Sequence, residues 1–476
     1  MNRTLEIVLA VVLVGTALAF GGVVPAAYSA MEIVLFASVL ALLIHETWQG
    51  GLELHVAVPP VLFALWLGLE LVPLPAGFVR SLEPARFQNP VQLHGSIPAW
   101  VTLSIYPHAT ILAGIRFLAY LAAFVLAVEV FDSRRRTSLL VRSLIGLGLF
   151  EAVYGSVEYL TGWEKIFTYT KQAYTGMATG TYINHNHFAG ALEMTLPFVV
   201  GYVFYYFQLW QEERGRRFSR SGRPASSAGF AAVACVFLVI IMLVGLLFSR
   251  SRSGILGALI SLLFIALLAQ LRVRRKTWLL GLFVFLAVAV GYGLWIGLGP
   301  MLARFEMLGL GQKEFDVATR LSFYKDALGI IRDYPWTGTG LGTFGVAFRH
   351  YQSDWVVYFV EHVHDDYVEF AAETGLLGAV LLFAPIVYLL VRMIIAFVTD
   401  SRRYRPSVLL GCVGSVLAIL LHSATDFNLQ IPANALILAV VLGIGYKAAC
   451  VERKTEDAES APARPRHRAH AAAGRH

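Results

Sequence analysis

The chain has 476 residues, of which 57% are hydrophobic and only 14% are charged. This composition lies far from that of a soluble globular chain, so it excludes an ordinary soluble domain. The formal net charge is +7, with 38 Lys and Arg against 31 Asp and Glu. Because the basic residues fall between apolar runs, the charge indicates contact with anionic lipid headgroups rather than binding of nucleic acid.

Apolar runs of about twenty residues recur along the chain, the length of helix that crosses a hydrocarbon core of roughly 30 Å. The runs are continuous rather than alternating, which favours α-helices over a β-barrel. The first run is long and no small-residue cleavage site stands out, so we expect no cleavable signal peptide. We predict an all-α polytopic membrane protein with about twelve spans, near residues 5–24, 27–45, 56–74, 108–130, 138–160, 187–208, 229–248, 255–271, 278–298, 376–397, 408–424 and 430–449.

Basic residues in the connections predict the orientation. With a cytoplasmic N-terminus, the inner connections carry the basic groups, namely Arg134 to Arg136, Arg214–Arg223, Arg272–Lys276, Arg402–Arg405 and the tail after residue 450. The outer connections are poor in basic residues for their length, so both termini are predicted to be cytoplasmic. Residues 1–450 are then one transmembrane domain, and 451–476 form a disordered basic tail.

Three outer connections are longer than a turn needs, near residues 75–107, 161–186 and 299–375. In the last, large and partly helical, apolar residues at helical spacing predict an amphipathic helix over 318–333 that lies at the interface. These residues are Leu321, Tyr324, Leu328 and Ile331. A turn-rich link with Gly338, Gly340 and Gly342 follows; no predicted strand precedes it, so we do not expect a nucleotide-binding loop.

The short connection Ser249–Gly254 between the seventh and eighth spans contains Arg250 and Arg252. Either these arginines snorkel from a helix end, or they hold a fixed anionic partner. The predicted topology places the loop outside, where arginine is disfavoured, which supports a functional role. Arg252 is favoured because it opens the next helix, and a guanidinium can bind phosphate oxygens in bidentate fashion.

Two histidines, His362 and His364, alternate just before the tenth span. They fit the edge of a solvated loop, a metal site or a catalytic base, and a histidine titrates near neutral pH as a base requires. Asp365 and Asp366 follow directly, and they either orient an imidazole or hold a divalent cation with it. The sequence does not choose between these roles.

At the start of the sixth span, Asn184 and Asn186 suit helix capping, while the same amides and the imidazoles of His185 and His187 also suit binding of sugar hydroxyls. No zinc-ligand spacing is present. Several ionisable residues fall within spans, where such groups pair or face a cavity: Arg116, Glu129, Glu151, Glu158, Glu193 and His422. Arg116 either lines a pocket or pairs with a neighbouring glutamate. Asp426, in the last outer turn, is either a helix cap or a site residue.

Together the outer face offers arginines, histidines and carboxylates, which suit a substrate with a diphosphate near the headgroups. The inner connections lack the paired aspartates expected for a metal-held nucleotide sugar. A lipid diphosphate donor therefore fits better than a nucleotide-activated one.

The chain resembles the O-antigen ligase and O-antigen polymerase superfamily of bacterial envelope glycosyltransferases. The resemblance covers roughly residues 108–445. Each block that carries the resemblance is weak alone, but the four stand in the family's order. They are Gly180–Gly190 with Pro197, Ser249–Gly254, Arg320 with Pro335–Phe344, and His364–Tyr367 with Glu373–Gly378; His422, Asp426 and Pro432 also follow a familiar last-loop pattern.

The resemblance implies an inverting, metal-independent transfer without a cofactor, at the periplasmic face of the bacterial inner membrane. A glycan on undecaprenyl diphosphate would pass to an acceptor hydroxyl. Carried over by position, His364 is the base, and Arg252 and Arg320 bind the diphosphate; His362, Asn186, His187, Asp365 and Tyr367 complete the predicted substrate site.

This chain departs from the family pattern at two positions. Asp365 stands where the family commonly has asparagine, so either the base is more strongly polarised or a cation binds. Met177 stands where many members have arginine, so Arg116 or Arg250 is expected to supply the missing diphosphate contact.

The resemblance leaves the acceptor open. A polymerase would extend a lipid-linked glycan, a ligase would use lipid A-core, and a third branch glycosylates protein serines. The Asn184–Gly190 run is more like exopolysaccharide-cluster members, which favours a polymerase. A lipid-linked oligosaccharide flippase is the alternative from another class, although no internal repeat is evident and the polar residues cluster outside rather than at mid-membrane.

Overall fold

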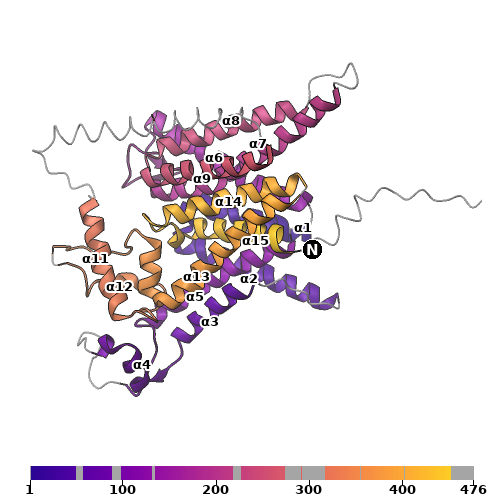
Figure 1. Cartoon of the computed structure of the whole chain (residues 1–476). Coiled ribbons are helices and arrows are strands. Elements are labelled where there is room, and N and C mark those ends of the chain that lie inside the picture. Colours follow the sequence, from indigo (N-terminus) through magenta and orange to yellow (C-terminus); the bar gives the residue numbers. More distant parts are fainter. Residues whose placement is uncertain are drawn as a thin grey trace, which may run out of the picture.

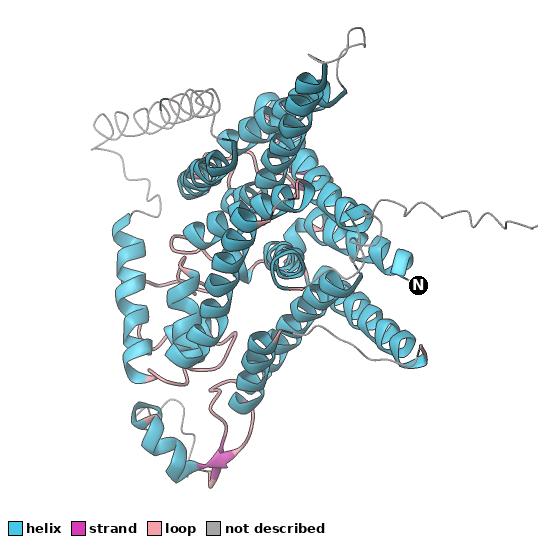
Figure 2. Cartoon of the chain, turned by 45° about the vertical axis from the view of Figure 1, so that its right-hand side comes forward, coloured by secondary structure: helices cyan, strands magenta, loops and turns pink. Residues whose placement is uncertain are grey.

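The computed structural model of this chain describes residues 2–49, 57–87, 98–130, 134–217, 227–273, 291, 317–353, 355–400 and 402–451. Within these ranges the chain is almost entirely helical (Figure 2). The helices are α1 (Asn2–Leu18), α2 (Pro25–Trp48), α3 (Val58–Glu70), α4 (Ala76–Leu82), α5 (Pro107–Val130), α6 (Arg134–Thr161), α7 (His185–Arg217), α8 (Ser227–Phe248), α9 (Arg252–Val273), α11 (Val317–Asp333), α12 (Phe344–Phe348), α13 (Asp366–Thr399), α14 (Tyr404–His422) and α15 (Pro432–Cys450), with 3-10 turns η1 (Phe20–Gly22), η2 (Pro84–Phe87) and η3 (Asn428–Gln430).

Two small antiparallel ribbons lie in two of the predicted outer connections. Strand β1 (Leu74–Pro75) pairs with β2 (Trp100–Val101), and β3 (Lys165–Ile166) pairs with β4 (Tyr169–Thr170). The first ribbon holds the two ends of its connection together near the ends of the helices, and the second is a hairpin within its connection.

Among the described residues, nine helices are long and apolar enough to cross a membrane: α2, α5, α6, α7, α8, α9, α13, α14 and α15. Each coincides with a predicted span, so the chain is a polytopic all-α membrane protein. Two further predicted spans correspond to shorter helices, α1 with 17 residues and α3 with 13. The predicted span 278–298 and the predicted tail lie outside the described residues, and the number of spans and the side of the termini stay predictions.

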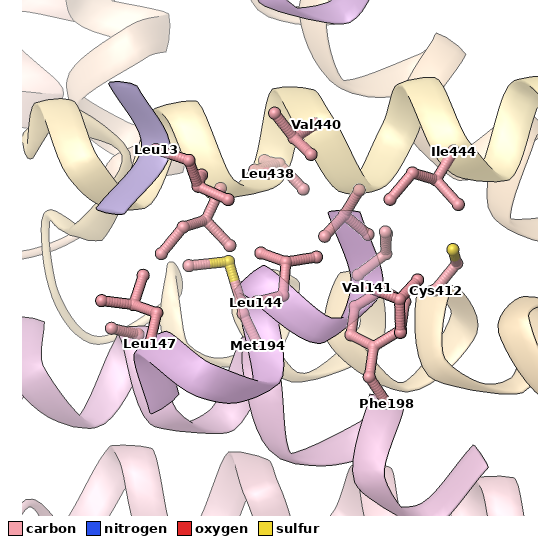
Figure 3. Close-up of a cluster of buried hydrophobic side chains, with 14 of the residues drawn as sticks. Leu13, Val141, Leu144, Leu147, Met194, Phe198, Cys412, Leu438, Val440 and Ile444 are labelled. Carbon is pink, nitrogen blue, oxygen red and sulfur yellow. The ribbon is translucent and has the colours of Figure 1, made fainter. Parts of the chain in front are cut away.

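Helices α7 and α14 form the centre of the bundle. Their apolar windows are 83% and 72% buried, against 17% for α13, which leaves most of its surface for lipid. Glycines on α14 allow the close approach: a Cβ at Gly411 would lie 2.5 Å from Phe198, and one at Gly414 would lie 2.6 Å from Pro197. Figure 3 shows Phe198 and Cys412 in this tightly packed core, beside side chains of α1, α6 and α15.

The two ends of the bundle differ in charge. In Figure 1 the helices run side by side, with α11, α12 and α4 at one end and the N-terminus at the other. The end with the N-terminus carries basic side chains that are held by local partners. Arg136 pairs with Glu6 at 2.6 Å, and the Arg134 guanidinium lies 4.8 Å from the centre of the Tyr404 ring.

A small second core caps the opposite end. Phe323, Ala327 and Ile330 of α11 pack against Phe348 of α12 and Val363 before α13. The predicted helix over 318–333 is confirmed, and Tyr324 and Ile331 of its predicted apolar face pack against this core. The side chain of Leu321 lies outside the described residues, and the assignment of Leu328 is wrong.

The side chain of Leu328, which the prediction placed on the apolar face, is 55% exposed. Helix α11 has two apolar stripes, and the spacing alone does not say which one finds a partner. The stripe that begins at Phe323 is the buried one, because residues 344–363 pack on it. The helix therefore packs on the protein's own cap.

We predict that Phe323→Ala destabilises this cap, whereas Leu328→Ala does not. Truncating a buried phenylalanine costs about 3 kcal/mol, and an exposed leucine costs under about 0.5 kcal/mol. The measurement is the rate of protease cleavage within residues 317–363, with thermal unfolding of the purified protein beside it. Equal effects of the two substitutions would contradict the observed face.

Candidate active site

One end of the bundle brings together the starts of α7, α9 and α13 and the turn between α14 and α15. His364, just before α13, has a φ of 61°, in the left-handed region that few side chains adopt. The Tyr324 hydroxyl of α11 donates to its carbonyl oxygen at 2.9 Å. Surrounding contacts must offset the strain of this conformation, which His364 shares with Phe20, Phe167, Tyr174 and Arg250 among the non-glycine residues.

The Asp426 carboxylate is the partner of that histidine. His364 Nδ1 lies 3.2 Å from Asp426 Oδ1, and the Phe427 main-chain N–H donates to the same oxygen at 2.9 Å. The side-chain amide of Asn186, on α7, donates to Oδ2. Three segments far apart in the sequence therefore meet at one carboxylate.

Asp426 keeps its charge although it is fully buried. Burial alone would raise its pKa, but the hydrogen bond from His364 and the nearby imidazoles of His187 and His422 hold the pKa well below its usual range. A carboxylate at Nδ1 favours the tautomer with the proton on that nitrogen, which makes Nε2 the basic nitrogen of His364.

The Phe427 ring is an aromatic platform for three imidazoles. His362 stacks on it at 4.3 Å with the rings 16° apart. His364 and His187 meet it edge to face at 4.9 and 4.7 Å. The ring fixes the spacing of His362 and His364, the two histidines predicted before the tenth span.

His362 differs from His364 in its carboxylate partner. Its Nδ1 lies 2.7 Å from Glu369 Oε1, and the Val363 main-chain N–H donates to the other carboxylate oxygen at 3.1 Å. Burial would lower the pKa of His362, but the charge and hydrogen bond of Glu369, together with the charges of Glu361 and Glu373, outweigh burial and raise the pKa to about 9. At neutral pH this imidazole therefore carries a positive charge beside the His364 base.

Asp365 and Asp366 do not orient His364. Asp365 is the N-cap of α13 and accepts from the Val368 N–H at 3.0 Å. Asp366 is buried and accepts from the Ser423 hydroxyl at 2.7 Å and from the Leu429 N–H at 3.1 Å. Both carboxylates thus hold the start of α13 in place. Within the described ranges, no three His, Cys, Asp or Glu side chains come together as metal ligands.

The Ser249–Gly254 segment presents two exposed arginines on a rigid turn. Ser251 caps α9 by accepting from the Gly254 N–H at 3.2 Å, and Ser249 accepts from the Ser251 N–H at 3.1 Å. Arg250 has a φ of 56°, and Arg252 is the first residue of α9. In the part of the chain that the structure describes, neither guanidinium has a carboxylate partner.

At the start of α7 the two predicted roles divide between two asparagines. The side chain of Asn184 accepts from the Asn186 N–H at 2.8 Å, as a helix cap does. The side chain of Asn186, which is 7% exposed, donates its hydrogen bond to Asp426. His187 is also buried, with Nε2 4.0 Å from Asp426 Oδ1. Asn186 and His187 thus both contact Asp426. This favours a positioning role for them over direct binding of sugar.

The remaining predicted residues are Arg116, Tyr367 and Arg320. Arg116 lies well inside α5, where its Nε is 3.7 Å from Glu32 and its guanidinium covers the Tyr28 ring, and it also lines an apolar pocket between α5, α13 and α15. The Tyr367 hydroxyl donates to the Leu420 carbonyl at 2.6 Å, tying α13 to α14. Arg320 falls in α11, and its side chain is outside the described residues.

The glycine link after α11 is structural. Gly340 donates its N–H to the Glu373 carbonyl at 2.7 Å, Leu341 donates to the Glu70 carboxylate at 3.1 Å, and Phe344 donates to the Glu373 carboxylate at 2.9 Å. Because these amides already bind carboxylates and a carbonyl, they do not form a phosphate cradle, in agreement with the sequence.

Three contributors to the site had little or no sequence signal. Asp426 was ambiguous because a polar residue in a helix-to-helix turn is commonly a cap. Glu369 lies seven residues after His362, before the predicted start of the next span at residue 376, and no motif in the sequence marks it. Nothing in the sequence marks Phe427, since a phenylalanine in a membrane protein is ordinarily a lipid-facing or core residue.

Taken together, the geometry provides a histidine base oriented by a buried carboxylate, a second imidazole that is positively charged, and two exposed arginines nearby. The Ser253 hydroxyl, next to Arg252, lies 3.2 Å from His422 Nε2, and His422 accepts the main-chain N–H of Asp426, so the arginine turn and the base are neighbours. This set can deprotonate a hydroxyl and neutralise an anionic leaving group.

Comparison with known proteins points the same way. Residues 237–383 match a family model described as O-antigen ligase. The matched region contains the arginine turn and both histidines, and it confirms the resemblance to the O-antigen ligase and O-antigen polymerase superfamily. No curated protein matches the chain.

We predict that His362 loses its proton only as the pH rises through about 9, above the ordinary value of 6.5. The Glu369 carboxylate stabilises the charged form, so Glu369→Gln should shift the titration down towards the ordinary value. Histidine-selective NMR of the purified protein measures this, with His362→Gln to assign the signal.

Glu361→Gln is the matched control, because Glu361 is an exposed carboxylate on the same loop whose charge also raises the pKa of His362, but less than Glu369 does. The other ionisable groups near His362 are Glu373 and the imidazoles of His187 and His364, which both substitutions leave in place. A downward shift as large in Glu361→Gln as in Glu369→Gln would contradict the assignment.

Proposed function

We propose that this protein is a glycosyltransferase of the bacterial inner membrane, related to the O-antigen ligases, that moves a glycan from undecaprenyl diphosphate to an acceptor hydroxyl. The observation that carries the proposal is the Asp426–His364 pair beside the exposed Arg250 and Arg252. A base and paired cations at one end of a helical bundle suit a donor whose lipid lies in the membrane and whose diphosphate lies at its surface.

His364 acts as the general base in this proposal. The acceptor oxygen attacks the anomeric carbon of the donor's reducing-end sugar, and its proton passes to His364 Nε2. The bond from that carbon to the diphosphate oxygen breaks, and undecaprenyl diphosphate leaves with the electron pair. Attack opposite the leaving group inverts the anomeric centre. Asp426 stabilises the imidazolium that forms, because its carboxylate accepts a hydrogen bond from Nδ1–H and carries the opposite charge.

The diphosphate contacts are assigned to Arg252, Arg250 and the protonated His362. Arg252 and Arg250 lie on the turn before α9, and His362 is held charged by Glu369. Met177 stands where many family members have an arginine, so one diphosphate contact has to come from another residue. The sequence analysis expected Arg116 or Arg250 to supply it, and we assign it to His362. Arg116 is less suited, because it already contacts Glu32 and Tyr28. Arg320 remains a predicted contact from the family pattern.

The charge difference between the two ends of the bundle supports a periplasmic site. Arg134, Arg136 and Arg405 lie at the end opposite to His364, as expected of cytoplasmic ends under the positive-inside rule. Exposed tryptophans, Trp163 and Trp336, lie in the connections on the side of the site, where aromatic side chains suit a membrane interface.

For the acceptor, we retain the polymerase, which adds to a lipid-linked glycan, with ligation to lipid A-core as the alternative. The Asn184–Gly190 run favours polymerisation, and the description of the matched family favours ligation. A flippase is disfavoured because the ionisable residues of the site gather at one end of the bundle, and a transporter needs them at mid-membrane.

We predict that His364→Ala abolishes glycan transfer and leaves membrane insertion intact, because the acceptor loses its base. The measurement is the lipid-linked product profile of a deletion strain of the parent bacterium that expresses the variant. Accumulated single repeats indicate a polymerase, accumulated long chains a ligase, and material trapped on the inner leaflet a flippase. His350→Ala, at an exposed histidine of the same cap, is the control; a normal polymer in His364→Ala would exclude His364 as the base.

We also predict that Arg252→Lys impairs transfer, because it keeps the charge and loses the planar fork that binds two phosphate oxygens. Losing one charge-assisted hydrogen bond of about 1.5 kcal/mol lowers kcat/KM for the donor about tenfold. The assay uses purified protein in detergent with lipid-linked donor. Arg332→Lys, at an exposed arginine of α11, is the control. An unchanged kcat/KM in Arg252→Lys would argue against bidentate binding.

A further inference from the structure

Below the arginine turn, three side chains from three helices form a buried hydrogen-bonded chain. Glu193 Oε1 of α7 lies 2.8 Å from His422 Nδ1, at the last residue of α14, and His422 Nε2 lies 3.2 Å from Ser253 Oγ of α9. The Glu193 and His422 side chains are completely buried. Ionisable groups in the membrane are costly, so a buried pair of this kind calls for a role.

The two ring nitrogens of His422 are held from opposite sides. With the proton on Nδ1, the ring donates to the Glu193 carboxylate and Nε2 accepts from the Ser253 hydroxyl; with the proton on Nε2, the ring donates to Ser253 and accepts from a protonated Glu193. Because both nitrogens are occupied, the ring has one orientation. Ser253 follows Arg252 directly in the first turn of α9, so the same ring fixes the turn that carries the arginine.

The main chain of His422 connects this chain to the base. Its carbonyl oxygen accepts the N–H of Thr425 at 2.9 Å and the N–H of Asp426 at 3.1 Å. These bonds form the turn that presents the Asp426 carboxylate to His364. His422 therefore touches the arginine turn through its side chain and the base through its backbone.

Glycines on α9 let that helix approach the chain closely. A Cβ at Gly254 would lie 2.6 Å from Ala189 Cβ and 3.3 Å from His422 Cε1, and a Cβ at Gly257 would lie 3.0 Å from Glu193 Oε2. The first two turns of α9 thus rest on the Glu193–His422 pair with no space for a larger side chain.

We propose that Glu193, His422 and Ser253 are positioning residues that fix Arg252 relative to the Asp426–His364 pair. None of the three is assigned a contact with substrate. The inference rests on the proposed function for the meaning of that placement, since Arg252 there binds the donor diphosphate. The donor diphosphate is already charged when it binds, so a misplaced Arg252 weakens donor binding and appears mainly in KM, with a smaller effect on kcat as charge builds on the leaving group.

The test compares Ser253→Ala with Ser261→Ala. Both serines lie on α9, and Ser261 Oγ donates to the Gly414 carbonyl of α14, so the control loses a buried hydrogen bond between the same two helices deeper in the bundle. Loss of the Ser253 bond is expected to raise the donor KM about five- to tenfold with kcat within about twofold, as for one hydrogen bond. Ser261→Ala is expected to leave both constants unchanged.

A second readout does not depend on activity. Hydrogen exchange of the purified protein should show faster exchange of residues 253–256 in Ser253→Ala and not in Ser261→Ala. In the Arg252→Lys background, Ser253→Ala should add little to the KM, because both changes act through one side chain.

The outcomes separate this inference from the proposed function. Equal exchange at residues 253–256 in the two serine variants would overturn the positioning role, whatever the activity. So would a change confined to kcat, or full additivity with Arg252→Lys. If wild-type protein transfers no glycan while the exchange difference is present, the proposed function fails and the placement of the α9 turn stands.

Discussion

The Asp426 carboxylate receives hydrogen bonds from the His364 imidazole, from the Asn186 amide and from the Phe427 main chain. A buried charge is tolerated only when its lone pairs are met by donors. Because those donors come from three separate segments, the charge is stable only when the α7 start, the loop before α13 and the turn after α14 are in place together. The position of the His364 base is thus set by the hydrogen bonds that the buried Asp426 carboxylate requires.

The sequence predicted the features that depend on local pattern. Spans follow from the length of apolar runs. Arg252 stood out because it lies in a predicted outer connection, whereas basic residues favour the inner connections. The carboxylate that orients His364 was not predictable in the same way. Asp365 and Asp366 adjoin His364 along the chain, but the start of α13 turns one towards its own amides and the other towards Ser423. Asp426 reaches the ring from 62 residues away, and no local pattern encodes that contact.

The apolar face of α11 was placed only in part for a related reason: Tyr324 and Ile331 flank the buried stripe, whereas Leu328 faces away from it. Two stripes of apolar residues satisfy the helical period, and a choice between them requires knowing what else folds nearby. Phe323 is buried and Leu328 exposed because the cap formed by residues 344–363 lies on one side only. Periodicity locates a helix, but the partner surface determines which stripe is buried.

The blocks shared with the O-antigen ligases divide into chemical and structural parts. Gly338 and Gly375 have φ values of 68° and 67°, and a Cβ at either would lie 2.2 Å from main-chain atoms of the other's segment, so they permit the cap to join α13. His364 and Arg250 also have positive φ but are not glycines, with φ of 61° and 56°. A left-handed side chain costs roughly 1 kcal/mol, and glycine would remove that cost. Glycine would also remove the imidazole and the guanidinium. Phe20, Phe167 and Tyr174 are also non-glycine residues with positive φ, so the strain alone does not mark a site. At His364 and Arg250 the strain coincides with an imidazole on Asp426 and an exposed guanidinium, which is the combination that the proposed chemistry uses.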